Sequence, residues 1–180
     1  MVSQKLPTSS REIATTRPFA TSWHLFLRAA RSHPKGLENR IRSAVRLIFL
    51  SVCCCLCGVA ALKRPERRYR KDVSSKSGIP LPEAEYPFEL GWVFVMPSAR
   101  GRRFSLDLTQ AALSAAGTAG VFATSRTDNI PMNAVLTKFG FVPAGHPYPS
   151  TRGSHQLQLF VRRSAQRGAP GKRSPDVAGH

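Results

Sequence analysis

The stretch that most constrains this chain runs from Phe88 to Ser105 and reads FELGWVFVMPSARGRRFS. Apolar residues fill both alternating sets of positions ahead of Pro97, a pattern typical of a strand that is buried on both faces. Pro97 has no N–H to donate to a ladder and therefore ends the strand. We expect this strand to be central in its sheet. Its predicted faces are Phe88, Leu90, Trp92, Phe94 and Met96 on one side, with Val93 and Val95 on the other.

A basic loop follows the strand, and a helix follows the loop. The loop contains Arg100, Gly101, Arg102 and Arg103, and apolar residues at helical spacing then predict a helix over Arg102–Ala116. The first N–H groups of a helix have no partner within it, and the helix dipole makes this end positive. A strand, a basic turn with a glycine and a helix N-terminus together predict an anion-binding site.

This stretch resembles the acetyl-CoA loop of the GNAT superfamily of N-acetyltransferases. The family pattern is Arg/Gln-x-x-Gly-x-Gly/Ala, preceded by an apolar strand that ends in Val-x-Pro. Arg100 fills the first position, whereas Arg103 stands where the family usually has glycine and Ser105 where it has glycine or alanine. We expect Arg103 to fit there with an ordinary helical backbone conformation.

Ahead of this stretch the chain has a polar beginning and two candidate helices. Residues 1–22 show no clear apolar period and are predicted to be poorly ordered, with at most a short strand near Glu12–Thr16. Apolar residues at helical spacing predict helices over Trp23–Arg31 and Leu37–Val45.

The run from Leu47 to Leu62 carries no charge and permits two interpretations. A transmembrane helix needs about 20 apolar residues, so the run is slightly short for one. We favour a hairpin with strands over Leu47–Cys53 and Leu56–Lys63 and a tight turn near Cys54. No stable membrane anchor is then expected, and a membrane-associated protein is the alternative.

All the cysteines lie in this run, at Cys53, Cys54, Cys55 and Cys57. Neighbouring residues of a strand point to opposite faces, and no second cluster elsewhere completes a zinc site. We expect small buried thiols in a reducing compartment and no metal site.

The polar, basic segment Lys63–Gly78 is predicted to contain a short exposed helix, because Pro65 suits its first turn and Gly78 its end. Two interpretations of its cations stay open: a solvated basic face, or the rim of a substrate cleft. The cations concerned are Arg67, Arg68, Arg70 and Lys71.

The later part of the chain alternates strands and helices. Val121–Thr124 is predicted as a buried strand, and Asp128 or Asn129 as the cap of a helix that Gly140 closes. Phe141 and Val142 open another strand. The remaining predictions are a turn or splayed loop at His146–Pro149, a last strand at Leu157–Arg162 and a disordered basic tail over 164–180.

This order strengthens the resemblance, which covers residues 45–163. The Asp128-Asn129 pair before the helix and the Gly140-Phe141 pair after it are similar to a later motif of the family. The resemblance implies an α/β (α+β) fold with a GNAT-like mixed central sheet, a V-shaped split and flanking helices. We expect it to form a single acyltransferase domain over 23–163.

The resemblance also implies a site. Acetyl-CoA, as co-substrate, would bind in the split between the fourth and fifth strands, and a primary amine of unknown identity would attack its thioester directly. Strand backbone would pair with the pantetheine arm, and the loop would hold the pyrophosphate. The cofactor-binding residues implied are Val93, Phe94, Val95, Arg100, Gly101, Arg102, Arg103, Phe104, Ser105 and Asn129.

Two residues are predicted to be catalytic. Glu89 stands where several family members carry a general-base carboxylate; a structural carboxylate paired with an arginine is the alternative. The family's usual acid, a tyrosine one turn before the Gly-Phe pair, is Leu136 here. Tyr148 is predicted to replace it as the proton donor to the departing thiolate, with water as another donor and a plain packing role for Tyr148 as the alternative.

The net charge of +17 and the pI of about 11.2 favour anionic partners, which include nucleic acid, anionic membrane and a phosphorylated cofactor. Our main hypothesis is a cytoplasmic N-acetyltransferase. The alternative is a basic protein on a GNAT-like scaffold that binds or modifies nucleic acid.

Overall fold

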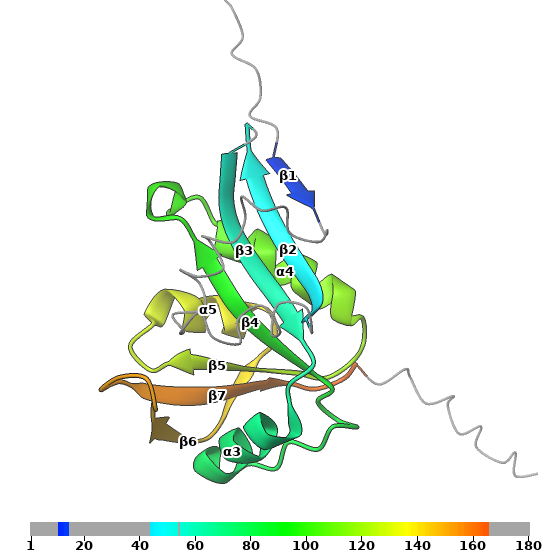
Figure 1. Cartoon of the computed structure of the whole chain (residues 1–180), viewed down its shortest axis with the longest axis vertical. Coiled ribbons are helices and arrows are strands. Elements are labelled where there is room, and N and C mark those ends of the chain that lie inside the picture. The colour runs from blue at the N-terminus through cyan, green and yellow to red at the C-terminus, as the bar shows by residue number, and fades with distance from the viewer. Residues whose placement is uncertain (1–10, 15–43, 54, 166–180) are drawn as a thin grey trace, which may run out of the picture.

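The computed structural model describes residues 11–14, 44–53 and 55–165. This part of the chain forms a seven-stranded mixed sheet in the order β1-β2-β3-β4-β5-β7-β6 (Figure 1). The strands are β1 Arg11–Ala14, β2 Ala44–Val52, β3 Cys55–Lys63, β4 Phe88–Val95, β5 Val121–Arg126, β6 Val142–Pro149 and β7 Gln156–Arg162. The helices are α3 Arg67–Ser77, α4 Phe104–Ala116 and α5 Ile130–Lys138, with a 3-10 turn η2 at Pro97–Ala99.

Several predicted segments lie outside the described residues: the helix over Trp23–Arg31, most of the helix over Leu37–Val45, and the tail from residue 166 onward. The end of the second helix prediction is wrong, because Ala44 and Val45 begin β2. The short N-terminal strand is β1, which overlaps the predicted Glu12–Thr16.

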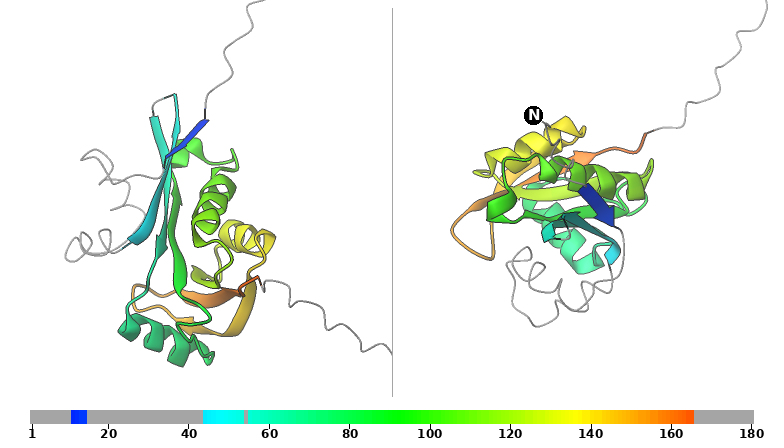
Figure 2. Two further views of the ribbon diagram at one scale, coloured as in Figure 1. Left: turned by 90° about the vertical axis from the view of Figure 1, so that its right-hand side faces the viewer. Right: turned by 90° about the horizontal axis from the view of Figure 1, so that it is seen from above.

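Helices α4 and α5 cover one face of the sheet, and α3 packs from the other side near β6 and β7 (Figure 2). The apolar stripe of α4 includes Phe104, Leu108 and Ala112, which are buried against Ile48 and Leu62 of the hairpin strands. A second cluster under α3 joins Val73 to β5 and β7. The sheet is therefore apolar on both faces, as the sequence of its central strand predicts.

Strand β4 is central, as predicted, but a bulge interrupts it. Ala61 pairs with Gly91 and Val59 with Phe94, so β4 has one residue more than β3 between these two pairs. Trp92 lies in this bulge with a φ of 54°. An extra residue in one strand reverses the alternation of every side chain beyond it.

The predicted division of the β4 faces is therefore wrong beyond the bulge. Val93 and Val95 pack on the α4 face together with Leu90, whereas Trp92 and Phe94 pack with β2 and β3 on the other face. The sequence pattern could not show this, because apolar residues occupy both faces.

The hairpin interpretation of the uncharged run is confirmed by the β2–β3 pair, whose last partners are Val52 and Cys55. Cys53 has a φ of 49° at the turn. Among the described residues, none of the helices has the length and apolar character that a membrane span needs. The prediction of buried thiols is wrong for Cys53 and Cys55, which are exposed because they lie at the turn end of the hairpin.

The segment His146–Pro149 is not a turn but the end of β6, where Tyr148 pairs with Leu157. Prolines are tolerated there because β6 is an edge strand and its outer side needs no ladder donor. The predicted helix in Lys63–Gly78 is α3, and Gly78 ends it with a φ of 74°.

Candidate active site

A cleft opens where β4 and β5 separate. In the described chain these parallel strands pair only at Phe88 with Val121 and at Glu89 with Phe122, and they diverge from there on. The cleft between them has a volume of about 900 Å³. Its walls come from β4 residues 90–95, β5 residues 123–126, the loop before α4, the first turn of α5 and the β6–β7 loop. The side of β4 that faces the cleft consequently has backbone groups without a strand partner.

The cleft is strongly basic. It is lined by Arg100, Arg103, Arg126, Arg152 and His155, and none of the described lining residues is a carboxylate. Arg126 is held 3.0 Å from Asp128, which lies outside the lining. Charges of one sign within a concave wall of protein raise the local concentration of oppositely charged ligands. The cleft is therefore suited to an anionic ligand.

The loop between β4 and α4 has two residues in the left-handed region. Gly101 has a φ of 79°, and Arg103, at the N-cap position of α4, has a φ of 63°. The expected ordinary helical conformation of Arg103 is therefore wrong. The position demands the backbone that glycine adopts most easily, which is the residue the GNAT pattern has there.

The N-terminus of α4 forms one wall of the cleft. No side chain caps this helix at Arg103, while Phe104 and Ser105 of its first turn line the cleft. Arg100 turns back on the strand, and its Nε lies 3.4 Å from the carbonyl oxygen of Val95. The positive end of the helix dipole makes this N-terminus a site for an anion such as a phosphate.

Asn129 lies on the opposite wall of the cleft and also caps α5. Its Oδ1 accepts a hydrogen bond from the N–H of Met132 at 3.4 Å and so caps α5. Asn133 secures the same corner, because its Nδ2 donates to the carbonyl oxygens of Arg126 and Thr127. The capped first turn of α5 presents Asn129 and Met132 to the cleft.

Glu89 is buried beside the cleft but does not line it. Its Oε2 lies 2.9 Å from Nζ of Lys63, the residue directly opposite on β3. Its Oε1 accepts a hydrogen bond from the Tyr69 hydroxyl at 3.2 Å. The Lys63 ammonium also lies 5.0 Å from the centre of the ring of Trp92, a residue that lines the cleft. The partner of Glu89 is thus a lysine, not the arginine of the structural alternative.

Tyr148 is buried under α3 with Val73 and Leu159, and it does not line the cleft. Burial, followed by the charges of Asp72 and Glu89, raises the pKa of Tyr148 to about 12. Its hydroxyl is therefore protonated throughout the neutral range.

The structure brings together most of the predicted cofactor residues. Those lining the cleft are Val93, Phe94, Val95, Arg100, Gly101, Arg103, Phe104, Ser105 and Asn129. Arg102, Glu89 and Tyr148 are outside the lining. Leu136, at the position of the family's tyrosine, is buried and lines the cleft.

The predictions from the sequence did not include Arg126, Arg152 and His155, which line the cleft. One feature of the sequence pointed to Arg126: it lies at the carboxyl end of a predicted strand, as the basic loop lies at the carboxyl end of β4. The cations of α3 do not rim the cleft; Arg67, Arg68 and Lys71 are exposed elsewhere, which agrees with a solvated face. Arg70 is instead buried and donates to the carbonyl oxygens of Leu81 and Tyr86.

No protein-family model matches the sequence, and no curated protein matches it. Solved structures do match the fold. An IAA acetyltransferase from Bacillus cereus ATCC 14579 aligns with a TM-score of 0.62 at 14% identity, over 86% of this chain and 99% of that one. The structure of yncA from Salmonella typhimurium with its cofactor acetyl-CoA aligns with a TM-score of 0.63 at 13% identity, over 91% and 99%.

A GNAT-family acetyltransferase from Bacillus cereus ATCC 10987 is similar as well, with a TM-score of 0.60 at 12% identity, over 87% of this chain and 99% of that one. The chain therefore has the α/β fold of the GNAT acetyltransferases, with the split sheet that the resemblance implied.

Proposed function

We propose that the protein is an acetyl-CoA-dependent N-acyltransferase that moves an acetyl group to a primary amine. The observation that carries this proposal is the cleft at the point where β4 and β5 diverge, with a helix N-terminus and several arginines in its walls. This arrangement offers both a backbone edge and an anion site to one extended, phosphorylated ligand.

The described residues fit acetyl-CoA. Its pantetheine arm contains amides, and the edge of β4 at Val93–Val95, which β5 does not pair, can bind them as it would an added strand. We propose that the pyrophosphate binds at the first turn of α4 and the Arg103 side chain, which line the cleft. Asn129 and Arg126 lie on the facing wall for the rest of the ligand. Arg102 remains a proposed contact through its charge, since its side chain is outside the lining.

The bound thioester supplies an electrophilic carbonyl carbon and a thiolate leaving group. The acceptor amine must lose a proton to attack, and we propose Glu89 as the base that finally holds it. The departing thiolate must gain a proton, and the two proposed sources are water in the open cleft and Tyr148. Substitution of Tyr148 by phenylalanine separates them, because only the second source is lost.

Calorimetric titration with acetyl-CoA tests the proposal directly, with pantetheine as the matched ligand that lacks the pyrophosphate. We expect acetyl-CoA to bind more tightly than pantetheine, and addition of a panel of primary amines to release free thiol. A folded protein, verified by circular dichroism, that binds neither ligand would contradict the proposal.

The exposed cations of α3 favour a second candidate function, nucleic-acid binding. Arg67, Arg68 and Lys71 lie on the outside of the helix and away from the cleft. A mobility shift with random duplex DNA at two salt concentrations tests it, since phosphate contacts weaken steeply with salt. Charge reversal of Arg67 and Lys71 should abolish this shift and leave acetyl-CoA binding unchanged; an unchanged shift would exclude this face.

A further inference from the structure

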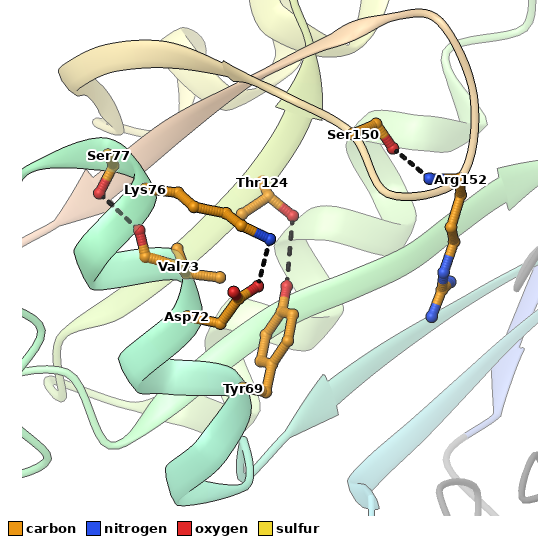
Figure 3. Close-up of polar contacts among 8 residues, drawn as sticks. All are labelled: Tyr69, Asp72, Val73, Lys76, Ser77, Thr124, Ser150 and Arg152. Atoms are coloured by element: carbon orange, nitrogen blue, oxygen red, sulfur yellow. Dashed lines mark hydrogen bonds and ion pairs between the residues drawn. The ribbon is translucent and has the colours of Figure 1, made fainter.

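The buried carboxylate of Glu89 is connected to the cleft through two hydroxyl groups. The Tyr69 hydroxyl donates to Oε1 of Glu89 at 3.2 Å and lies 3.5 Å from Oγ1 of Thr124. Thr124 lines the cleft, whereas Glu89 does not. Figure 3 shows Tyr69 extending from α3 with its hydroxyl directed at Thr124. The chain Thr124–Tyr69–Glu89 thus joins the cleft to a buried carboxylate outside its lining.

The fold holds Tyr69 in this position. Its neighbour Arg70 is buried and donates to the carbonyl oxygens of Leu81 at 3.3 Å and Tyr86 at 2.6 Å. The Arg70 guanidinium also lies 5.6 Å from the Phe122 ring of β5. These contacts fix α3 against the segment that leads into β4. The tyrosine before Arg70 is therefore presented to β4 and β5 by an anchored helix.

We propose that Tyr69 relays the proton of the acceptor amine from Thr124 to Glu89, an inference that rests on the proposed acyltransferase function. An N–H bond of the acceptor ammonium breaks and an O–H bond forms at Oγ1 of Thr124. The original Thr124 proton moves to the Tyr69 oxygen, and the Tyr69 proton moves to Oε1 of Glu89. The amine and Glu89 end neutral, and both hydroxyl groups are restored.

The charged and titratable groups around the relay suit this direction of transfer. Lys63 approaches Glu89 from β3 and pairs with its ionised form between turnovers. Arg70 from α3 also acts electrostatically on Glu89, and Tyr148 from β6 is a further titratable group close to Tyr69. Desolvation and the Glu89 charge raise the pKa of Tyr69 well above its ordinary value. Tyr69 consequently stays protonated near neutral pH and can donate to Glu89.

The two distances, 3.2 Å and 3.5 Å, are long for O–H···O hydrogen bonds. Catalytic hydrogen bonds are often long without substrate and tighten when it binds. The ammonium group of an acceptor beside Thr124 would draw its oxygen into a charge-assisted hydrogen bond and align the hydroxyl protons toward Glu89.

The test compares two acceptors for the Tyr69→Phe variant. One is the aliphatic primary amine that gives the fastest thiol release with the wild-type protein; the other is hydroxylamine, a weak base that is already neutral near pH 7. With the aliphatic amine we expect kcat to fall by about 10²-fold, the lower end of what positioned proton transfer contributes. With hydroxylamine we expect kcat to change little. The loss with the aliphatic amine should shrink as pH rises.

Two further variants complete the design. Tyr86→Phe removes a hydroxyl from a buried tyrosine of the cluster under α3 and should leave both rates unchanged. The double variant Tyr69→Phe with Glu89→Gln should be no slower than Glu89→Gln alone, because residues that act as one unit are not additive.

An equal loss with both acceptors would show that Tyr69 only supports the structure, and an unchanged kcat would show that the proton takes another route. Either result overturns the relay. Failure of the proposed function is distinguishable, because it appears in the wild-type protein as an absence of acetyl-CoA binding.

The part of Thr124 in the relay is tested with a pair of variants. With the aliphatic amine, Thr124→Ser should retain activity and Thr124→Val should lose it. Equal rates for these two variants would show that the proton does not pass through Thr124.

Discussion

Lys63 and Glu89 are opposite each other on β3 and β4, with Nζ of the lysine 2.9 Å from Oε2 of the carboxylate. The Glu89 side chain is 6% exposed and that of Lys63 is 19% exposed. Loss of one partner would therefore leave a largely desolvated charge without its counter-charge.

The first prediction concerns the stability of this pair. Lys63→Met should lower the free energy of unfolding by about 3 kcal/mol, the lower end of the range for breaking a buried pair, since the lysine is partly exposed. The double variant Lys63→Met with Glu89→Gln should recover part of that loss, because the unpaired charge is gone. Urea denaturation measures both values. Strictly additive losses would show that the two side chains are not coupled.

The second prediction concerns the left-handed residue before α4. A non-glycine residue in this conformation destabilises the fold by about 1–2 kcal/mol. Glycine removes this strain but loses more conformational entropy on folding, which offsets part of the stabilisation. Arg103→Gly should therefore raise the free energy of unfolding by roughly 0.5–1 kcal/mol. Arg102→Gly is the matched control, because Arg102 does not have a positive φ, and it should not stabilise the fold. Equal effects at both positions would refute the strain argument.

The third prediction separates the two arginines by ligand affinity. Arg103 lines the cleft and Arg102 does not, although both are exposed and adjacent. Arg103→Glu should weaken acetyl-CoA binding by about tenfold or more, which corresponds to the loss of one charged hydrogen bond. Arg102→Glu should weaken it less and mainly at low salt, as expected for a screened charge. If the single reversals have equal effects measured by calorimetry, the N-terminus of α4 is not the phosphate site.

The fourth prediction concerns alkaline pH. The pKa of Tyr148 rises from 10 to about 12 on folding, so between these values the unfolded chain releases the proton while the folded chain keeps it. The unfolded state then binds fewer protons, and the free energy of unfolding decreases as pH rises from 10 to 12. In Tyr148→Phe this part of the decrease should be absent. Thermal unfolding of both proteins across this pH range measures it, and parallel curves would contradict the assignment.

The β4 strand and the loop after it could be predicted from the sequence because their signals are local. Continuous apolar residues, Pro97 and the basic turn all lie within one stretch, and the structure places them as expected. The bulge at Trp92 left no such signal, because both faces of the strand are apolar. When the bulge exchanges the faces of the side chains that follow it, apolar residues only replace other apolar residues, so the hydrophobic pattern of the sequence stays the same.

The network around Glu89 could not be predicted because it depends on tertiary packing. Tyr69 lies among cations on a polar helix, and on sequence alone it is indistinguishable from a solvated residue. The buried Arg70 contacts with Leu81 and Tyr86 hold the helix against the segment that leads into β4. The left-handed backbone of Arg103 was equally hidden, since arginine rarely adopts it and only the family pattern has glycine there.

The last prediction concerns Glu89 itself. Glu89→Gln keeps the shape and removes the proton acceptor, so kcat with an aliphatic amine should fall by roughly 10²–10⁴-fold near neutral pH, the range that general-base assistance contributes. Acetyl-CoA affinity should change little, because Glu89 does not line the cleft.

The loss in Glu89→Gln should shrink at high pH, where the acceptor amine is already neutral. A purely structural carboxylate predicts a different result: a lower Tm and reduced activity at every pH, because Lys63 loses its partner. The pH profile of kcat and the thermal unfolding of the same preparation distinguish the two roles. Wild-type kcat at pH 7 in Glu89→Gln would exclude Glu89 as the base, and with it the relay through Tyr69.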